Sequence, residues 1–206
     1  MMPHNKPVFS VLVLCGGKSS RMGRDKALLE LDGETLLERT KRLGKALGAQ
    51  QVLVSRNEAG FIQDLVSDAG PMAGIAAAIP HCHTGWLLVL PVDMPLLTPQ
   101  ALDPLLLDSL VYPRGSFIEG FPLPVLLENT YELQQSLAAA LSDPTAKRSL
   151  HQAWTRLGLR QLPLLLPMSF QNCNDPISFA NIQAQLLGGH AAQPTTERRC
   201  SQASGA

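Results

Sequence analysis

The 206-residue sequence has few aromatic residues, few charged residues and no net charge. Its 17 Lys and Arg balance its 17 Asp and Glu, whereas proteins that bind duplex nucleic acid usually carry an excess of positive charge. Aromatic residues make up only 5%, which leaves little material for a surface that stacks single-stranded bases. Hydrophobic residues reach 45%, which excludes a disordered or collagen-like chain. We therefore expect a globular domain with a sizeable core and no nucleic acid among its partners.

Long apolar runs and paired cysteines are also missing. No segment reaches the roughly 20 apolar residues that a membrane-spanning helix needs. The run from Val8 to Cys15 is too short for a signal peptide and lacks its cleavage site, so we interpret it as a buried strand. The four cysteines are scattered without a CxxC pair, which is typical of reduced thiols in a chain without an export signal. These features predict a cytoplasmic protein that does not bind membranes.

Short β-rich runs alternate with stretches of helical periodicity, which is typical of a sheet connected by crossover helices. Val8–Leu14 is a continuous apolar run, as expected of a strand covered on both faces. Thr35 and Glu38 have the spacing of a capping box and predict a helix that ends near Gly48. We expect a single-domain, Rossmann-like, three-layer α/β/α fold with a mostly parallel central sheet.

The remaining elements are predicted from the same patterns. Further strands are expected at Gln51–Ser55, Phe61–Val66, Trp86–Leu90, Ser116–Ile118, Leu123–Leu127, Gln161–Leu166 and Ser169–Asn172. Further helices are expected at Met72–Ile79, from Thr98 to about Leu107, and at Thr130–Leu141, Thr145–Leu157 and Pro176–Leu187. The domain then spans residues 1–187, and residues 188–206, rich in Gly, Ala, Gln, Thr and Ser, form a flexible tail.

The most informative stretch, residues 14–26, follows the first strand. It lies at the carboxyl end of a buried strand, where open α/β sheets place their ligands. Gly16 and Gly17 let a ligand approach the backbone amides without a clash. Four cations face a single acid within nine residues; they are Lys18, Arg21, Arg24 and Lys26. A bound triphosphate requires this combination, because its charge must be met by fixed donors.

Two known phosphate-binding loops do not fit this stretch. A Walker loop would need glycine at position 12, which is Leu12, and the GxGxxG pattern of dinucleotide-binding folds is absent. The alternative is a basic surface turn that binds nothing. The paired glycines directly after a buried strand favour phosphate binding over that alternative.

Asp93 is a second candidate, because it follows the apolar strand Trp86–Leu90 and is held between Pro91 and Pro95. A carboxylate is costly there unless it meets a cation. Mg²⁺ is a suitable cation, since it typically takes one or two carboxylates together with phosphate oxygens and waters. The alternative is that Asp93 caps the next helix, but Thr98, next to a first-turn proline, is the better cap.

Residues 14–29 resemble the LAGGxSxRMGxDKxLL signature of the nucleotidyltransferases, and most of all that of the molybdenum cofactor guanylyltransferases. Three later motifs agree with that family in order and spacing: Asp64 followed by Gly70–Ile75, Pro91–Pro95, and Phe170–Pro176. Together they cover residues 8 to about 187. The sequence departs from the family at Cys15, where alanine is usual, and at Ser55, where asparagine is common and Asn57 is a stand-in. The helix usual between the second and third strands is almost missing.

The resemblance implies Mg²⁺-dependent transfer of GMP from GTP to the phosphate of molybdopterin, with release of pyrophosphate. In that reaction Gly16 and Gly17 would hold the β- and γ-phosphates, Arg21 the leaving pyrophosphate and Lys26 the α-phosphate. The implied catalytic residues are Arg21, Lys26 and Asp93. The implied nucleotide-binding residues are Leu14, Cys15, Gly16, Gly17, Lys26, Ser55, Asn57, Asp64 and Asp93. Asn174 would share the metal with Asp93, and a turn or cap role before Pro176 is the alternative for this asparagine.

The base and the acceptor leave alternatives open. Relatives that use CTP carry alanine where this chain has Gly16, and a glycine there leaves room for a purine, which favours GTP. The first alternative is a nucleotidyltransferase for another base or acceptor, such as a molybdopterin cytidylyltransferase or a sugar-phosphate nucleotidyltransferase. The second is a non-catalytic nucleotide-binding factor of cofactor assembly, which has no need for both a basic loop and a metal carboxylate. Cofactor-assembly proteins are further candidate partners.

Overall fold

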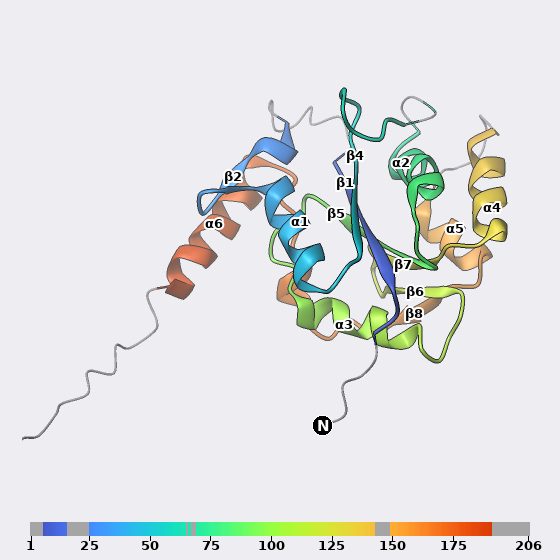
Figure 1. The fold of residues 1–206 in the computed structure, drawn as a ribbon. Coiled ribbons are helices and arrows are strands. Elements are labelled where there is room, and N and C mark those ends of the chain that lie inside the picture. Colours follow the sequence, from blue (N-terminus) through green and yellow to red (C-terminus); the bar gives the residue numbers. More distant parts are fainter. Residues whose placement is uncertain (1–5, 16–24, 65, 67–68, 143–148, 191–206) are drawn as a thin grey trace, which may run out of the picture.

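The structure is a computed structural model that describes residues 6–15, 25–64, 66, 69–142 and 149–190 (Figure 1). A six-stranded sheet has the order β4-β1-β5-β7-β6-β8. Its strands are β1 (Phe9–Leu14), β4 (Gln51–Ser55), β5 (Trp86–Pro91), β6 (Gly115–Ile118), β7 (Phe121–Glu128) and β8 (Arg160–Leu162). Strand β7 pairs antiparallel with β5 and β6, and the other pairings are parallel. Five of the six strands therefore point the same way, which confirms the mostly parallel sheet.

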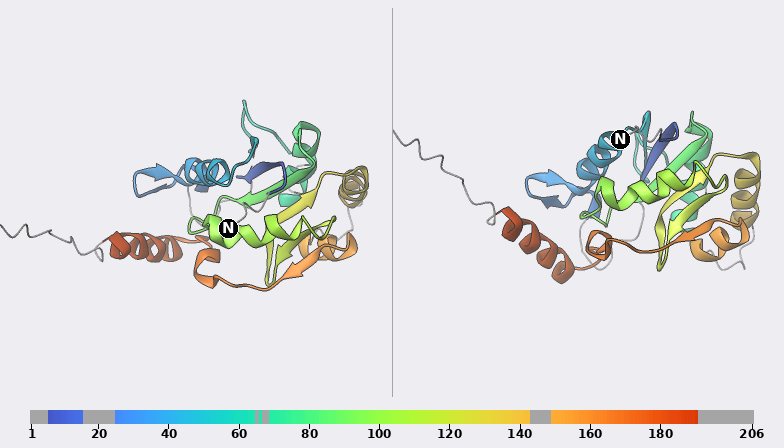
Figure 2. Two further views of the ribbon diagram at one scale, coloured as in Figure 1. Left: turned by 60° about the horizontal axis from the view of Figure 1, so that its bottom comes forward. Right: turned by 90° about the horizontal axis from the view of Figure 1, so that it is seen from below.

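Helices cover both faces of this sheet (Figure 2). The α-helices are α1 (Leu36–Ala46), α2 (Pro71–Ala78), α3 (Pro99–Asp108), α4 (Tyr131–Ser142), α5 (Leu150–Arg156) and α6 (Pro176–His190). Successive side chains of a strand point to opposite faces, so β1 contributes to two cores. Val11 and Val13 belong to a core that includes residues of α1, α3 and α6. Leu12 and Leu14 belong to a second core with residues of α2, α4 and α5, which confirms the three-layer architecture.

The shorter elements connect the strands and helices along the chain. A hairpin of β2 (Glu30–Leu31) and β3 (Glu34–Thr35) leads into α1, and 3₁₀ helices span Lys26–Leu28, Ile79–His81 and Pro167–Phe170. The two predicted caps are present: the Thr35 hydroxyl accepts from the Glu38 N–H at 3.2 Å, and the Thr98 hydroxyl accepts from the Ala101 N–H at 3.3 Å. Glu38 does not complete the capping box with its own side chain, which pairs with Lys41 at 2.7 Å instead.

Three predicted strands differ from the structure. The described residues of the segment 61–66 form no strand; Ile62 makes an isolated parallel bridge to Ser55, because too few residues separate the two segments for a crossover. Strand β8 ends at Leu162 rather than Leu166, since Pro163 cannot donate to the sheet. Ser169 and Phe170 of the predicted strand Ser169–Asn172 instead belong to the 3₁₀ helix Pro167–Phe170, which proline begins, a position that favours this residue.

The helices near the C-terminus also differ in length from the prediction. The helix predicted over Thr145–Leu157 spans Leu150–Arg156, with Ser149 as its cap, and residues 143–148 lie outside the described residues. Helix α6 continues to His190, past the predicted end at Leu187, and residues 191–206 of the predicted tail lie outside the described residues. Within the part of the chain that the structure describes, no helix is long and apolar enough to cross a membrane.

Candidate active site

A cavity of about 410 Å³ lies beside the carboxyl ends of β1 and β5. These two strands are parallel neighbours, and the ends of parallel strands are where α/β sheets bind their ligands. Four predicted site residues line the cavity: Leu14, Cys15, Lys26 and Asp93. Its other walls come from the start of α2, the turn between β6 and β7, and Asn172. The structure thus brings Leu14, Cys15 and Lys26 of the first signature motif to one cavity with Asp93.

Lys26 lies between the two residues that were predicted to bind the metal. Its Nζ donates a hydrogen bond to Asn174 Oδ1 at 2.6 Å and lies 3.6 Å from Asp93 Oδ2. The side chains of Lys26 and Asp93 are 19% and 26% exposed, so both groups remain accessible to a ligand while being partly shielded from bulk water. A single ammonium group therefore contacts two side-chain oxygens at the edge of the cavity.

Hydrogen bonds to the backbone of Asp93 hold this residue and the Phe170–Pro176 motif together. The Cys173 N–H donates to the Asp93 carbonyl at 2.8 Å, and the Cys173 thiol reaches the same carbonyl at 3.3 Å. The Val92 N–H donates to the Leu14 carbonyl at 3.1 Å. These contacts fasten the segment before α6 and the end of β1 to the Asp93 motif, which explains how Asn174 comes to lie beside Lys26.

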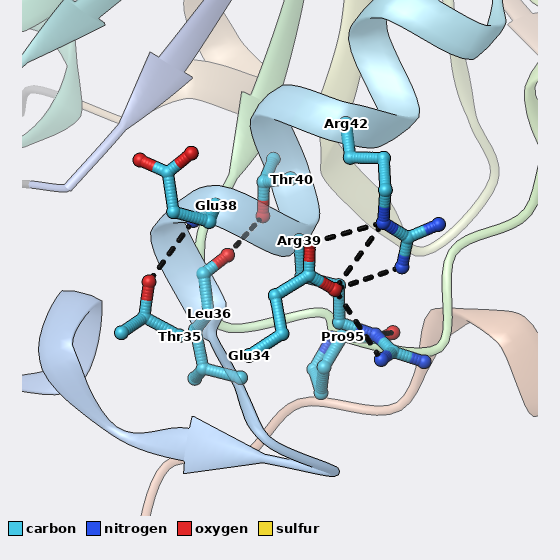
Figure 3. Close-up of polar contacts among 8 residues, drawn as sticks. All are labelled: Glu34, Thr35, Leu36, Glu38, Arg39, Thr40, Arg42 and Pro95. Carbon is cyan, nitrogen blue, oxygen red and sulfur yellow. Dashed lines mark hydrogen bonds and ion pairs between the residues drawn. The ribbon is translucent and has the colours of Figure 1, made fainter.

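Helix α1 fixes the other end of the Asp93 motif (Figure 3). Arg39, one turn into the helix, donates from Nε to the Pro95 carbonyl at 2.9 Å. Glu34, at the end of the β2–β3 hairpin, pairs with Arg42 at 2.8 Å and lies 4.0 Å from Arg39, so its carboxylate orients both arginines. The segment from Pro91 to Pro95 is therefore held at both ends, which limits the movement of Asp93.

Ser55, Asn57 and Asp64 form a second group at the end of β4. Asn57 Nδ2 donates to Asp64 Oδ2 at 2.9 Å, and its Oδ1 accepts from the Asp64 N–H at 2.8 Å. The Ser55 hydroxyl approaches Asp64 Oδ1 at 3.4 Å, and the Ser55 carbonyl accepts from the Cys15 N–H at 2.9 Å. The predicted nucleoside-contacting residues thus lie together and are attached to the cavity through Cys15.

Gly74 of α2 packs directly against this group. A Cβ atom at Gly74 would lie 2.5 Å from Ser55 Oγ, 3.0 Å from Leu14 Cδ2 and 3.3 Å from Asp64 Oδ1. The glycine in the Gly70–Ile75 motif is therefore needed for the close approach of α2 to β1 and β4.

The oxygens at the cavity edge fit a divalent cation. Asp93 offers a carboxylate and Asn174 an amide oxygen, which are the hard ligands that Mg²⁺ prefers, and both already face the ammonium of Lys26. Among the described residues, no three His, Cys, Asp or Glu side chains gather as a metal site. The donor set therefore suits a metal that takes its remaining ligands from phosphates and water, rather than a metal enclosed by protein.

The two cysteines at the site are poor nucleophiles. Burial raises the pKa of the Cys15 thiol to about 12 and that of the Cys173 thiol to about 11. Both thiols therefore favour the protonated form at neutral pH, which is the less nucleophilic form of a cysteine.

Arg56 is a buried residue beside the candidate site that the sequence motifs do not include. It directly follows β4, is 7% exposed, and donates from Nη2 to Asp25 Oδ2 at 2.6 Å and to Glu58 Oε1 at 2.7 Å. Burial acts to lower its pKa, but the hydrogen bond to Glu58 and the charge of Asp25 raise the pKa above its usual value. A sequence signal was present, because Arg56 is the single Lys or Arg in residues 46–113.

Part of the predicted site cannot be placed. Gly16, Gly17 and Arg21, together with the cations Lys18 and Arg24, lie outside the described residues. Their assignment to the triphosphate, and the argument from Gly16 for a purine base, stay predictions.

Comparisons with known proteins agree with this arrangement of motifs. Residues 11–157 match the family model of the MobA-like NTP transferase domain. The chain is 35% identical to the molybdenum cofactor guanylyltransferase of Xanthomonas euvesicatoria pv. vesicatoria over 176 residues, which cover 83% of this chain and 92% of that protein. It is 32% identical to the enzyme of the same name from Pseudomonas syringae pv. syringae, over 90% of this chain and 94% of the relative.

Solved structures share the fold at lower identity. Molybdopterin-guanine dinucleotide biosynthesis protein A from Archaeoglobus fulgidus has a TM-score of 0.72 and 23% identity, covering 87% of this chain and 99% of its own. The 2-C-methyl-D-erythritol 4-phosphate cytidylyltransferase of Thermus thermophilus has a TM-score of 0.61 and 19% identity, covering 86% and 98%. At these identities the likeness shows the shared fold alone.

Proposed function

The chain belongs to the MobA-like NTP transferase family, and from this membership we propose that it transfers GMP from GTP to the phosphate of molybdopterin. The observation that carries the proposal is the meeting of Lys26, Asp93 and Asn174 at one edge of the cavity. These residues come from three separate motifs, and together they offer one ammonium for a phosphate and two oxygens for a metal ion, which can neutralise charge in a nucleotidyl transfer.

The proposed reaction is a displacement at phosphorus. An oxygen of the acceptor's phosphate forms a bond to the α-phosphorus of GTP, and the bond to the bridging oxygen of the β-phosphate breaks. Pyrophosphate leaves with that electron pair. Because the acceptor phosphate is already an anion, no general base is needed, and positioning and charge neutralisation carry the catalysis. Lys26 neutralises charge at the α-phosphate, and Arg21 is assigned to the leaving pyrophosphate.

Nucleotidyltransferases of this family have a divalent-metal requirement, and we assign the metal as Mg²⁺. Asp93 and Asn174 would hold it through their side-chain oxygens, a donor set that this ion accepts. When bound there, the ion supplies positive charge to the phosphate oxygens. In the free protein the ammonium of Lys26 contacts these oxygens. With the ion bound, the ammonium would contact a phosphate of the nucleotide instead.

The Ser55, Asn57 and Asp64 group is assigned to the guanosine side of the pocket. Asn57 fixes both the side chain and the backbone of Asp64, so the carboxylate is held in one orientation. A fixed carboxylate can accept hydrogen bonds from a nucleoside, and a base without matching donors leaves that acceptor unpaired. Leu14 and Cys15 line the adjoining wall of the cavity.

The proposal is tested by incubating the purified protein with Mg²⁺, molybdopterin and GTP labelled at the α-phosphate. We expect the label to appear in a molybdopterin dinucleotide, with an equal amount of pyrophosphate released. Parallel reactions with CTP and ATP, and with sugar phosphates as acceptors, test the alternative nucleotidyltransferases. Faster transfer from CTP, or to a sugar phosphate, would replace the proposed substrates. Binding of GTP without pyrophosphate release would favour the non-catalytic assembly factor.

A GTP-dependent reaction is compatible with the cytoplasmic location expected from the sequence, which stays a prediction. Transfer of the finished cofactor to cofactor-assembly proteins is likewise a prediction. The end of the domain at residue 187 also stays a prediction.

A further inference from the structure

Arg56 carries a buried positive charge that the proposed reaction does not use directly. Its side chain is 8% exposed, and its Nη2 is committed to two carboxylates, Asp25 and Glu58. The guanidinium also lies over the ring of Phe61, with its carbon 5.6 Å from the ring centroid. Because this orientation is set by three neighbours, Arg56 is a rigid anchor rather than a side chain free to reach a phosphate.

The carboxylate of Asp25 connects this anchor to the active site. One of its oxygens accepts the bond from Arg56 Nη2 at 2.6 Å. The other accepts from the Ala27 N–H at 2.9 Å and so caps the 3₁₀ helix Lys26–Leu28. Lys26 is the first residue of that helix, so the direction of its side chain depends on the conformation that Asp25 imposes.

The opposite side of the same turn is fixed by packing. Ala27 is fully buried in the core that also contains residues of β1 and α1. The Leu28 N–H donates to the Asp25 carbonyl at 3.2 Å, which closes the turn. With Ala27 held in the core, the hydrogen bond from Arg56 sets the orientation of the Asp25 side chain. The orientation of Asp25 in turn sets the position of the backbone at Lys26.

We propose that Arg56 is a positioning residue for nucleotidyl transfer: through Asp25 it fixes the turn that places Lys26 Nζ beside Asp93 and Asn174. This inference rests on the proposed function, since it assigns a role in that reaction. The link is short and continuous, because each step from Arg56 to Asn174 is a hydrogen bond or a covalent neighbour. It joins the end of β4 to the cavity beside the end of β1, the adjacent parallel strand.

The first test replaces Arg56 and measures steady-state transfer. For Arg56→Met we expect kcat to fall about tenfold to a hundredfold, because displacement of a charge by about 1 Å at the reacting atom has effects of this size. The KM for GTP should change much less, since the loss lies in the orientation of a charge in the transition state. Arg56→Lys keeps a charge that can reach a carboxylate, and it should recover part of the lost kcat.

A matched control separates the link from a general loss of charge. Glu58→Gln removes the charge of the other carboxylate partner of Arg56, which is 54% exposed, but keeps an oxygen that can accept the hydrogen bond from Arg56 Nη2. This variant should keep the wild-type kcat. Asp25→Asn keeps the oxygen that caps the turn but weakens the pair with Arg56, and it should lower kcat like Arg56→Met. Equal losses in Glu58→Gln and Arg56→Met would overturn the proposal.

A double-mutant cycle with Lys26→Met gives the decisive readout. If Arg56 acts through Lys26, Arg56→Met should cause no further fall in kcat once Lys26 has been replaced. A merely structural role would reduce the fraction of active protein, and kcat would then fall by the same factor in both backgrounds, which would overturn the proposal. Thermal unfolding of each variant identifies any that fails to fold, in which case Arg56→Lys and Asp25→Asn complete the cycle.

The wild-type protein distinguishes this inference from the function on which it rests. If wild-type protein transfers no GMP to any acceptor, the proposed function fails. If it transfers GMP while Arg56 and Lys26 contribute independently, only the positioning role fails.

Discussion

Lys26 donates a hydrogen bond of 2.6 Å to the side-chain oxygen of Asn174, across 148 positions of the sequence. The same ammonium lies 3.6 Å from Asp93. The positively charged ammonium of Lys26 therefore lies between two oxygens that are assigned to the metal. A divalent cation and this ammonium compete for the same ligands, because two cations at such short range repel each other.

Replacing Lys26 should separate metal binding from catalysis. In the absence of nucleotide, Lys26→Met should bind Mn²⁺, used as a spectroscopic substitute for Mg²⁺, several-fold more tightly than the wild type, since a competing charge is lost. Its rate of GMP transfer should fall about a hundredfold, since one preorganised donor at a transferring group contributes that much. Electron paramagnetic resonance of free Mn²⁺ measures the first quantity. The surface variant Lys41→Met is the control, and an unchanged or weaker Mn²⁺ affinity in Lys26→Met contradicts the competition.

Asp93→Ala should abolish turnover. The substitution removes the carboxylate assigned to the metal, while Asp93 contributes only its backbone carbonyl to the contact with Cys173, so the local fold should persist. Pyrophosphate release with saturating GTP and Mg²⁺ measures the effect. Asp32→Asn, in the β2–β3 turn, is the matched control, because its positive φ of 57° is tolerated by asparagine. Wild-type transfer by Asp93→Ala would remove Asp93 from the metal site.

Gly74→Ala should destabilise the protein and weaken GTP binding. The new Cβ would lie 2.5 Å from the Ser55 hydroxyl, which is buried and has little room to move. Overpacking of this kind costs about 1–3 kcal/mol. The same atom displaces Asp64, so affinity for GTP should fall with stability. Urea unfolding and calorimetric titration with GTP measure the two effects.

Two variants check the cause assigned to the Gly74→Ala effect. Gly85→Ala has no atom within 4 Å of its new Cβ and should leave GTP affinity unchanged. Adding Ser55→Ala to Gly74→Ala removes the nearest contact and should restore part of the stability. If the double variant is no more stable than Gly74→Ala, the clash with Ser55 is not the cause.

The pKa of Cys15 makes stability depend on alkaline pH. Burial raises this pKa from 9.0 to about 12, so the unfolded chain loses the thiol proton at lower pH than the folded chain does. The contribution to stability is fully present below pH 9 and is lost as pH rises toward 12. Unfolding free energies measured by urea titration should fall over this range, and less steeply for Cys15→Ala. Equal slopes for the two proteins would contradict the assignment.

The short-range features of this protein could be predicted from the sequence. The apolar runs of β1 and β5, the caps Thr35 and Thr98, and the placement of Asp93 after a buried strand depend on neighbouring residues, and all are present in the structure. The order of the motifs likewise predicted the nucleotidyltransferase family that the comparisons established. Such features follow from side-chain periodicity and local hydrogen bonding, which the sequence contains in full.

Contacts between distant segments depended on the tertiary structure. The order of strands brings β1 beside β4, and only then does Arg56 meet Asp25 and does Cys15 meet Ser55. The backbone bond from Cys173 to Asp93 places Asn174 at Lys26, and no local pattern encodes that distance. The sequence by itself determined the apolar strands, the helix caps and the order of the family's motifs. The packing of the sheet decided which charged and polar side chains contact each other. Electrostatic and hydrogen-bond energies depend on separation in space rather than along the chain.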